Sequence, residues 1–451
     1  GALLTPPRPG PPRETWPSNP TAAALWRLRA QRGHPLPLSE FMETCLTNEA
    51  HGGFYTRAPS GVFGASGAFV TSPEISQMFG ELVGLWCAAT WQQMGSPARV
   101  RLVELGPGRG TLMADLLRGV RGINGFADAC EVELVEVSAS MRAEQASTLG
   151  VELQGSEGGG EEAVVPGASG VSASGNKVTW RSALGKVPDG DGVPSLILAH
   201  ELFDALPVHQ FRRTDKGWCE VMVEWGGETD ETEDLKFVLS PGPTTAAAAV
   251  AERRLAAMDK VQAEQLDALE ASPASWALAA EVARRVGGDK SAAGAALLID
   301  YGKFGPYEAS LQAIKEHKFV DLLETPGEAD LSAYVDFQAL AQAAAEAVPG
   351  AVAYEPVDQR TLLMSLGIDV RTEMLAQAAG EASEQAAALR SQRDRLCATG
   401  GDGMGERFMA MAIASKELPP PPVFARPYEP FSVPQAVAPD GAATWGKLQQ
   451  R

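Results

Sequence analysis

Apolar residues recur at three- and four-residue spacing in several stretches of the chain, which indicates helices with one buried face. The clearest helix is predicted over residues 73–95, and its buried positions are Ile75, Phe79, Leu82, Val83 and Trp86. Ser72 is expected to cap this helix, Pro73 to occupy its first turn and Glu74 to complement the positive end of its dipole.

Short apolar runs alternate with helical segments and predict buried strands. The predicted strands are 101–105, 131–137, 178–180, 195–199 and 296–301. The helices expected among and after them are 111–118, 139–148 and 336–347. A strand at 351–355, a helical region to about 396 and a closing strand at 406–414 complete the pattern. This alternation predicts parallel βαβ units and an α/β fold.

Two stretches interrupt the alternation. Residues 154–176 are rich in Gly, Ser and Glu without an apolar period, and we expect a flexible surface insertion there. Residues 212–290 are predicted to form an inserted lobe. That lobe begins with hairpin-like segments at 218–225 and 235–239, and Ala-rich helices follow over roughly 244–287.

The ends of the chain are rich in proline and frame one large domain. We divide the chain into an N-terminal arm at 1–35, a main domain at 36–415 and a C-terminal tail at 416–451. Short helices are predicted at 21–32 and 39–46, the second capped by Ser39. The Pro-rich start with Gly1 fits a trimmed presequence and an expression remnant alike.

The charge balance disfavours polyanionic partners. The chain has 38 Lys and Arg against 57 Asp and Glu, a net charge of −19. Nucleic-acid binding depends on clustered Lys and Arg, so a cationic or Arg-bearing partner is the better expectation. The five cysteines are scattered and the five histidines form no cluster, which argues against a disulfide framework and a metal site. No apolar run reaches the ~20 residues of a membrane span.

A glycine loop follows the first predicted strand and opens a helix. It reads Glu104-Leu105-Gly106-Pro107-Gly108-Arg109-Gly110-Thr111. Glycines let a ligand approach the backbone, and the helix start offers unpaired N–H groups. The spacing is G-x-G-x-G, whereas the dinucleotide fingerprint is G-x-G-x-x-G. An acidic residue just before the loop suits a cofactor with an ammonium and a sulfonium better than one with a pyrophosphate.

The second predicted strand ends at Glu136, whose carboxylate can accept both ribose hydroxyls of an adenosine. Taken alone, a glycine triplet is more often a plain tight turn. With its strand, its helix and Glu136, the loop indicates cofactor binding.

Several motifs together resemble the MidA-type methyltransferases, a family that includes the mitochondrial arginine methyltransferase assisting assembly of respiratory complex I. The motifs are 69–81 (FVTSPEISQMFGE), 103–111 (VELGPGRGT), 134–138 (LVEVS), 199–208 (AHELFDALPV), 299–302 (IDYG), 317–318, 326–331 (PGEADL), 335–337, 359–371 and 404–408. The resemblance spans about residues 35–415.

The resemblance implies a Rossmann-like class I methyltransferase sheet with an N-terminal helical segment and an inserted hairpin and helical lobe. It implies S-adenosyl-L-methionine as cofactor, bound by the loop residues Glu104, Gly106, Pro107, Gly108, Gly110 and Thr111 and by Glu136, with Ser72, Pro73 and Glu74 over the pocket. It further implies methylation of an arginine on a matrix-arm subunit of complex I, in the mitochondrial matrix.

The candidate catalytic residues are Glu201 and Asp204, just past the carboxyl end of a predicted strand. A guanidinium keeps its proton at neutral pH, so carboxylates that grip it are needed to orient one nitrogen and take up charge. A three-residue spacing puts both on one face if the segment is helical. The alternative is that they cap a helix. His200 and His209 are interpreted as structural histidines, and Tyr301 as either a channel residue or a half-buried strand end.

Three positions depart from the family pattern: Ala68 replaces an Asp, Lys303 a His and Gln312 an Arg. These changes redistribute charge near the expected pocket and favour a second hypothesis, a catalytically degenerate member acting as a scaffold or accessory subunit of a respiratory complex. A third hypothesis, an NAD-linked oxidoreductase, is disfavoured by the glycine spacing.

Overall fold

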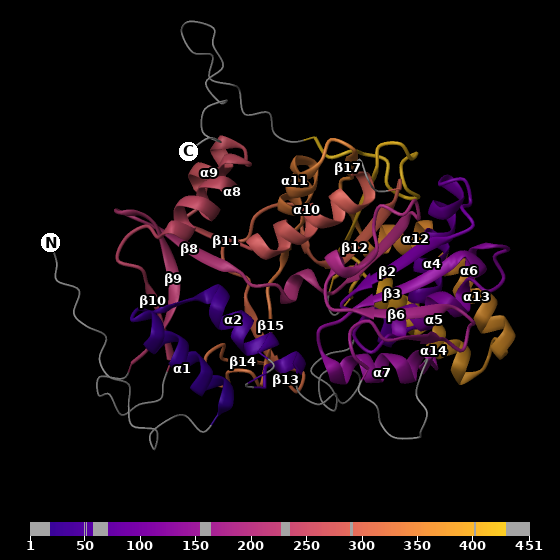
Figure 1. Cartoon of the computed structure of the whole chain (residues 1–451), viewed down its shortest axis with the longest axis horizontal. Helices are drawn as coiled ribbons and strands as arrows, with labels where there is room; N and C mark the ends of the chain where they lie inside the picture. Colours follow the sequence, from indigo (N-terminus) through magenta and orange to yellow (C-terminus); the bar gives the residue numbers. More distant parts are fainter. Residues whose placement is uncertain are drawn as a thin grey trace, which may run out of the picture.

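The computed structural model describes residues 19–48, 50, 52–56, 71–153, 164–226, 235–288, 292–400 and 403–429. A large twisted sheet flanked by helices forms one half, and a smaller β-rich lobe forms the other (Figure 1). No helix in these ranges is long and apolar enough to cross a bilayer.

The central sheet has the strand order β17-β19-β12-β7-β2-β3-β6-β5-β4. Its parallel strands are β2 (Val100–Leu105), β3 (Cys130–Val135), β6 (Lys177–Arg181), β7 (Ser195–His200) and β12 (Ala295–Lys303). The antiparallel strands β19 (Phe408–Ser415) and β17 (Ala351–Ala353) extend it beyond β12. The predicted parallel α/β architecture is therefore confirmed.

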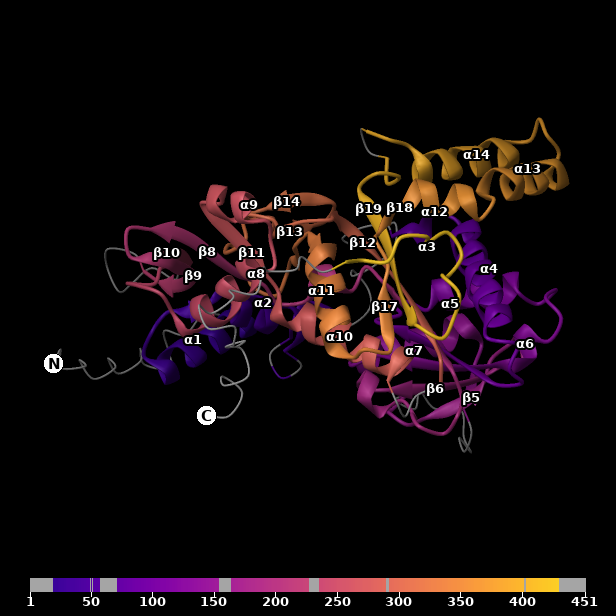
Figure 2. The same ribbon diagram turned by 90° about the horizontal axis from the view of Figure 1, so that it is seen from above.

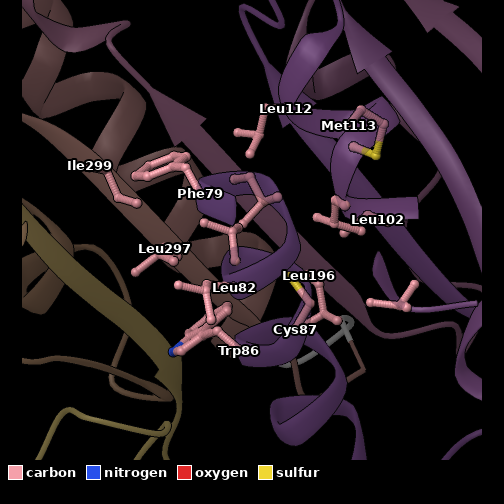
Figure 3. Close-up of a cluster of buried hydrophobic side chains, with 14 of the residues drawn as sticks. Phe79, Leu82, Trp86, Cys87, Leu102, Leu112, Met113, Leu196, Leu297 and Ile299 are labelled. Atoms are coloured by element: carbon pink, nitrogen blue, oxygen red, sulfur yellow. The ribbon is translucent and has the colours of Figure 1, made fainter. Parts of the chain in front are cut away.

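Helices cover both faces of this sheet, which explains why β2 and β7 are buried along their whole length. Leu196 and Leu198 point to the layer of α4 (Gln77–Gln93) and α5 (Thr111–Gly119). The intervening residues of β7 point to the opposite layer, formed by α10 (Pro273–Gly287) and α11 (Phe337–Ala347). Figure 3 shows Phe79, Leu82 and Trp86 of α4 in the first of these layers.

The helix predicted over 73–95 is divided in two. A single turn, α3 (Ser72–Ile75), is capped at Thr71, and α4 starts at Gln77 after Ser76. Ser76 is extended, and its hydroxyl accepts a hydrogen bond from the Met78 N–H, so a local side-chain cap starts a second helix. The prediction of Ser72 as the cap was therefore wrong, although Ile75, Phe79, Leu82, Val83 and Trp86 are all buried.

The smaller lobe contains a five-stranded sheet that includes the predicted hairpin. Its strands are β1 (Leu36–Pro37), β8 (His209–Thr214), β9 (Gly217–Trp225), β10 (Leu235–Leu239) and β11 (Ala268–Ala271). Strand β11 was missed, because it lies inside the stretch predicted as Ala-rich helices. It pairs with β8 more than 50 residues earlier, a tertiary pairing that overrides local helix propensity. The helices before it are short: a π-helical turn at Ala247–Ala251, α8 (Glu252–Ala256) and α9 (Lys260–Gln265).

Helices α1 (Pro20–Arg32) and α2 (Leu38–Thr47) pack against this lobe (Figure 1). The cap residue of α2 is Pro37 and no side chain caps it, so the expected role of Ser39 was wrong. A three-stranded sheet, β13 (Gln312–Lys315), β14 (Lys318–Val320) and β15 (Asp330–Ser332), lies beside α2.

Part of the stretch predicted as a flexible insertion is regular. Residues 154–163 lie outside the described residues, but β5 (Ser169–Val171) pairs antiparallel with β6 and with β4 (Glu152–Leu153). A Cβ at Gly170 would lie 2.3 Å from the backbone oxygen of Glu152. A glycine that suggested flexibility is therefore required for close strand pairing.

The chain between β18 (Val357–Asp358) and β19 forms the helices α12 (Gln359–Ser365), α13 (Ile368–Ala379) and α14 (Glu384–Cys397), with α13 and α14 projecting from one corner (Figure 2). Residues 416–429 of the predicted tail pack on the main domain. Phe424 is buried there, and the Pro422 carbonyl accepts a hydrogen bond from Trp86.

Candidate active site

A cavity of about 440 Å³ lies at the carboxyl ends of β2, β3 and β7. Ligands of open parallel sheets bind at this edge. Its lining combines the glycine loop with residues of the N-terminal segment and of the turn after β7. The predicted residues in the lining are Pro73, Glu74, Glu104, Gly106, Pro107, Gly108, Thr111, Glu136, Glu201 and Asp204.

The glycine loop turns sharply from β2 into α5. Gly106, Gly108 and Gly110 have φ angles of 61°, 51° and 83°, all in the left-handed region that favours glycine. A Cβ at Gly106 would lie 2.8 Å from the Leu202 side chain. Gly110 is the N-cap of α5 and does not line the cavity. Its position therefore forms the turn into α5, and the predicted contact with the ligand is not seen there.

Glu104 is the penultimate residue of β2 and a buried carboxyl group without a counter-charge. It is 2% exposed, and its Oε2 has no hydrogen-bond partner among the described residues. Burial raises its pKa to about 8. A buried acceptor that lines a cavity and lacks a partner fits a ligand that brings a positive charge or donor groups.

Glu136 follows β3 and is held in one orientation. The Ser138 N–H donates to its Oε1 at 2.8 Å, and Gln145 Nε2 donates to its Oε2 at 3.1 Å. The same Gln145 amide donates to the Gly108 carbonyl at 2.7 Å, so one side chain ties the acidic residue to the glycine loop. Burial is the main influence on the Glu136 carboxyl and raises its pKa.

The segment before α4 reaches the glycine loop from the other side. Glu74 Oε1 accepts a hydrogen bond of 2.9 Å from the Thr111 hydroxyl, and both residues line the cavity. Ser72 does not line it: its buried hydroxyl donates to Gln359 Oε1 at 3.2 Å. The backbone N–H of Ser72 instead contacts the Glu201 carboxyl group.

The turn after β7 brings Glu201 and Asp204 to the cavity by an arrangement that differs from the predicted helix. Only Phe203–Ala205 forms a 3-10 turn, and Glu201 has a φ of 49°, which is uncommon for a side chain with a Cβ. The turn is organised by Asp300 of β12, just past the residues that pair with β7. Its Oδ2 accepts from the backbone N–H groups of Leu202, Phe203 and Asp204 at 3.2, 2.9 and 3.3 Å.

Four carboxyl groups therefore meet at one end of the cavity: Glu201, Asp204, Asp300 and Asp330, which we call the acid cluster. Burial is the main cause of a raised pKa at each of them, to about 6 for Asp204 and to about 8 for Asp330. Three oxygens, Glu201 Oε1, Asp204 Oδ1 and Asp330 Oδ2, have no hydrogen-bond partner among the described residues. Glu201 and Asp204 line the cavity and Asp330 does not, and His200 Nε2 lies 3.4 Å from Glu201 Oε1. Buried acceptors are almost always paired, so the two oxygens in the lining indicate a ligand with donor groups.

Two tyrosines hold the other oxygens of this cluster. The Tyr301 hydroxyl donates to Asp204 Oδ2, and the Tyr55 hydroxyl donates to Asp330 Oδ1 at 2.6 Å. Of the two interpretations of Tyr301, the half-buried strand residue agrees with the structure, because Tyr301 is partly buried in β12 and does not line the cavity. Sequence reasoning missed Tyr55 and the role of Asp330, although Asp330 stands in the motif at 326–331 that carries the family resemblance.

The two histidines near the turn differ in their surroundings. Burial lowers the pKa of His200 to about 3, and its ring packs on Phe79 with centroids 5.0 Å apart. His200 also lines the cavity, and its Nε2 lies 3.4 Å from Glu201 Oε1. His209 Nδ1 lies 2.7 Å from Glu220 Oε1 in the β8–β9 hairpin. Among the described residues, no group of three His, Cys, Asp or Glu side chains is arranged to hold a metal ion.

The departures from the family pattern lie away from the described cavity lining or outside the described residues. Lys303 Nζ sits 4.3 Å from the centroid of the Tyr307 ring, and Gln312 begins β13. Neither residue lines the cavity. Ala68 falls outside the described residues.

Comparison with known proteins decides the family. Residues 82–355 match the model of a family described as S-adenosyl-L-methionine-dependent methyltransferases. Rat protein arginine methyltransferase NDUFAF7, mitochondrial, is 39% identical over 381 residues, which cover 84% of this chain and 81% of the relative. The chain belongs to this methyltransferase family. The human protein of the same name is 37% identical, with 84% and 80% covered.

Solved structures agree with the methyltransferase fold. A Burkholderia thailandensis protein solved with S-adenosyl-homocysteine superposes with a TM-score of 0.70 at 24% identity, covering 92% of this chain and 97% of that one. A native crystal structure from the same organism gives a TM-score of 0.67. The chain is thus an S-adenosyl-L-methionine-dependent methyltransferase, and its relatives' names indicate a mitochondrial location.

Proposed function

We propose that this methyltransferase modifies an arginine side chain of a partner protein in the mitochondrial matrix. By the family resemblance, the partner is a matrix-arm subunit of respiratory complex I. The observation that carries the proposal is the pair of buried acids Glu201 and Asp204, which line the cavity and each have an oxygen without a hydrogen-bond partner. The relatives are named protein arginine methyltransferases, which supports the same acceptor.

The cavity residues fit the cofactor from end to end. Glu136, fixed by Ser138 and Gln145, is placed to accept the ribose hydroxyls, and the left-handed glycines leave room for the backbone to approach. Glu104, a buried carboxyl group with an unpartnered oxygen, suits the positively charged end. When bound, S-adenosyl-L-methionine supplies a methyl group whose bond to sulfur breaks as the acceptor nitrogen bonds to the carbon.

The acid cluster suits a guanidinium acceptor because a guanidinium has many N–H donors and the cluster offers acceptor oxygens. A guanidinium offers five N–H donors in a planar fork, and carboxylates match two of them at a time. Glu201 and Asp204 both line the cavity, so they can turn one nitrogen toward the cofactor. Their raised pKa values make both carboxylates better proton acceptors, which helps because the methylated nitrogen must release a proton.

Asp330 and Tyr55 support this grip from behind the cavity wall. Asp330 is fully buried and does not line the cavity, while Tyr55 both lines the cavity and binds Asp330. Tyr301 orients Asp204 in the same way. Each acid with an unpartnered oxygen therefore has its position fixed by a neighbour, which favours recognition of a rigid planar cation.

The scaffold alternative makes a different prediction, namely cofactor binding without turnover. Its sequence support weakens because Lys303 and Gln312 lie outside the cavity lining. The deciding experiment incubates the protein with isotope-labelled S-adenosyl-L-methionine and each purified matrix-arm subunit of complex I. The proposal expects a mass increase of one or two methyl groups on one arginine. Binding of S-adenosyl-homocysteine with no labelled arginine on any subunit would support the scaffold instead.

A further inference from the structure

A second cavity of about 390 Å³ opens beside the acid cluster. It shares Thr47, Ala205 and Leu206 with the cofactor cavity. Ala205 directly follows Asp204, whereas no residue of the glycine loop lines the second cavity. The two spaces are therefore neighbours at the acceptor end, where Ala205 and Leu206 lie between them, and not at the adenosine end.

The walls of this second cavity come from three separate elements. Helix α2 contributes Ser39, Glu43, Leu46 and Thr47, whose spacing places them on one helix face. The turn after β7 forms the facing wall, and the start of α10 forms the third. The Ser272 hydroxyl donates to the Pro207 carbonyl at 2.8 Å and ties the last two walls together. We call this space the α2 groove.

We propose that the α2 groove binds the polypeptide main chain next to the target arginine, an inference that rests on the proposed function. An arginine side chain is only about 6 Å long from Cα to Cζ, as bond lengths near 1.5 Å imply. A protein whose guanidinium reaches Glu201 and Asp204 must therefore place its backbone close to the mouth of the acid cluster. The α2 groove lies at that mouth, because Ala205 and Leu206 belong to both spaces.

The chemistry of the groove indicates the kind of segment that it takes. Leu46, Leu206 and Pro273 form an apolar part of its wall, and Ser39, Thr47 and His209 add polar groups. The small side chains of Ala205 and Ala274 leave room for a main chain. Glu43 is exposed on α2 and adds a negative charge. The occupant is thus an extended segment with an apolar residue beside the arginine and without an acidic residue facing Glu43.

A free guanidino compound would leave the α2 groove empty, which makes the proposal testable by substrate length. The probes are acetyl-Ala-Leu-Arg-Leu-Ala-amide and acetyl-arginine-amide, both assayed for methyl transfer by mass spectrometry. Burying one leucine side chain in the groove predicts a kcat/KM roughly tenfold higher or more for the pentapeptide. Equal kcat/KM values for the two compounds would overturn the proposal that the α2 groove binds the main chain next to the arginine.

A matched pair of variants on α10 locates the effect. Ala274→Trp fills the groove and should remove the pentapeptide advantage, while kcat/KM for acetyl-arginine-amide and the Kd of S-adenosyl-homocysteine stay unchanged. Ala277→Trp adds the same bulk at an exposed position of the same helix and should retain the advantage. A pentapeptide advantage that survives Ala274→Trp contradicts the proposal.

A different result is expected if the proposed arginine methyltransferase function itself is wrong. Neither compound would then be methylated, although S-adenosyl-homocysteine would still bind, and both proposals would fall. A photoreactive benzophenone placed beside the arginine gives a second readout in the S-adenosyl-homocysteine complex. It is expected to crosslink to α2 or to the start of α10, and crosslinks confined to other elements would overturn the assignment.

Discussion

The Tyr55 hydroxyl donates a hydrogen bond of 2.6 Å to Asp330, although 275 residues separate them in the chain. Tyr55 comes from a 3-10 turn after α2, and Asp330 starts a strand of the small three-stranded sheet. This bond connects the N-terminal segment to the acid cluster at the mouth of the cavity. The acceptor end of the site is therefore assembled from parts of the chain that no local motif joins.

Asp330 should reduce the stability of the ligand-free protein at alkaline pH. Burial and then the charge of Asp204 raise its pKa from the ordinary 3.8 to about 8 in the folded state. A raised folded pKa stabilises the fold at low pH, and this stabilisation is lost as pH rises from about 4 through about 8. The slope is at most about 1.4 kcal/mol per pH unit for one group.

Asp330→Asn should remove this pH dependence and reduce activity. Thermal unfolding followed between pH 5 and pH 8.5 is expected to show a smaller fall in Tm for the variant than for the wild type. Methyl transfer to an arginine substrate should fall about tenfold or more, because a carboxyl group that interacts electrostatically with Asp204 is replaced by a neutral amide. Wild-type activity in this variant would show that Asp330 has no role in the acceptor site.

Asp300→Asn is the contrasting substitution in the same cluster. Asp300 accepts hydrogen bonds from four backbone N–H groups, those of Leu202, Phe203, Asp204 and Tyr301. An amide nitrogen at one of these positions would face N–H donors, at a cost of about 1–3 kcal/mol. The variant should therefore unfold at a lower temperature than the wild type at pH 5, where ionisation of the buried carboxyl groups costs least, whereas Asp330→Asn should not. Equal Tm values for the wild type and Asp300→Asn would contradict its role in shaping the turn.

Cofactor affinity should rise with pH because of Glu104. Burial raises the pKa of this carboxyl group to about 8, so it is protonated in the empty site at pH 6 to 7. Binding a cation favours the ionised form, and the proton must leave. Calorimetry is expected to show S-adenosyl-L-methionine binding up to about tenfold more tightly per pH unit below 8, with a plateau above it.

Two controls isolate Glu104. Adenosine carries no positive charge at these pH values, so its affinity should change little with pH. Glu104→Gln should bind S-adenosyl-L-methionine more weakly and without the pH dependence. An unchanged pH slope in Glu104→Gln would show that another group is responsible.

Much of the sheet could be predicted from sequence because its strands are buried on both faces. Runs such as 101–105 and 195–199 are mainly apolar and alternate with amphipathic helices, so local pattern and tertiary environment agree. The wrong predictions fall where the local pattern and the tertiary environment conflict. Strand β11 is Ala-rich and exists because β8 pairs with it, and Ser76 starts a second helix where the apolar period runs on.

The cofactor half of the site could be predicted because it is local. The glycine loop, Glu104 and Glu136 belong to consecutive βα units, and their spacing already indicates their chemistry. The acceptor half could not be predicted in full. Glu201 and Asp204 were found from their place after a strand, whereas Tyr55 and Asp330 meet them only through the tertiary fold.

Gly108→Val should abolish cofactor binding. Gly108 has a φ of 51° and lines the cavity, so a branched side chain would strain the backbone and enter the space of the ligand. Gly122→Ala is the control, since a Cβ there meets nothing within 4 Å. Calorimetry with S-adenosyl-homocysteine should show no heat for the first variant and wild-type affinity for the second. Normal binding by Gly108→Val would mean that the cofactor lies elsewhere.

The most direct test of the account is Glu201→Gln, measured for turnover and for cofactor affinity in parallel. Glu201 lines the acceptor end and has an unpartnered oxygen, so methyl transfer to arginine should fall by about a hundredfold or more. The Kd of S-adenosyl-homocysteine should stay within about twofold of the wild type. Full turnover in the variant, or equal losses in turnover and cofactor affinity, would contradict a guanidinium grip by the acid cluster.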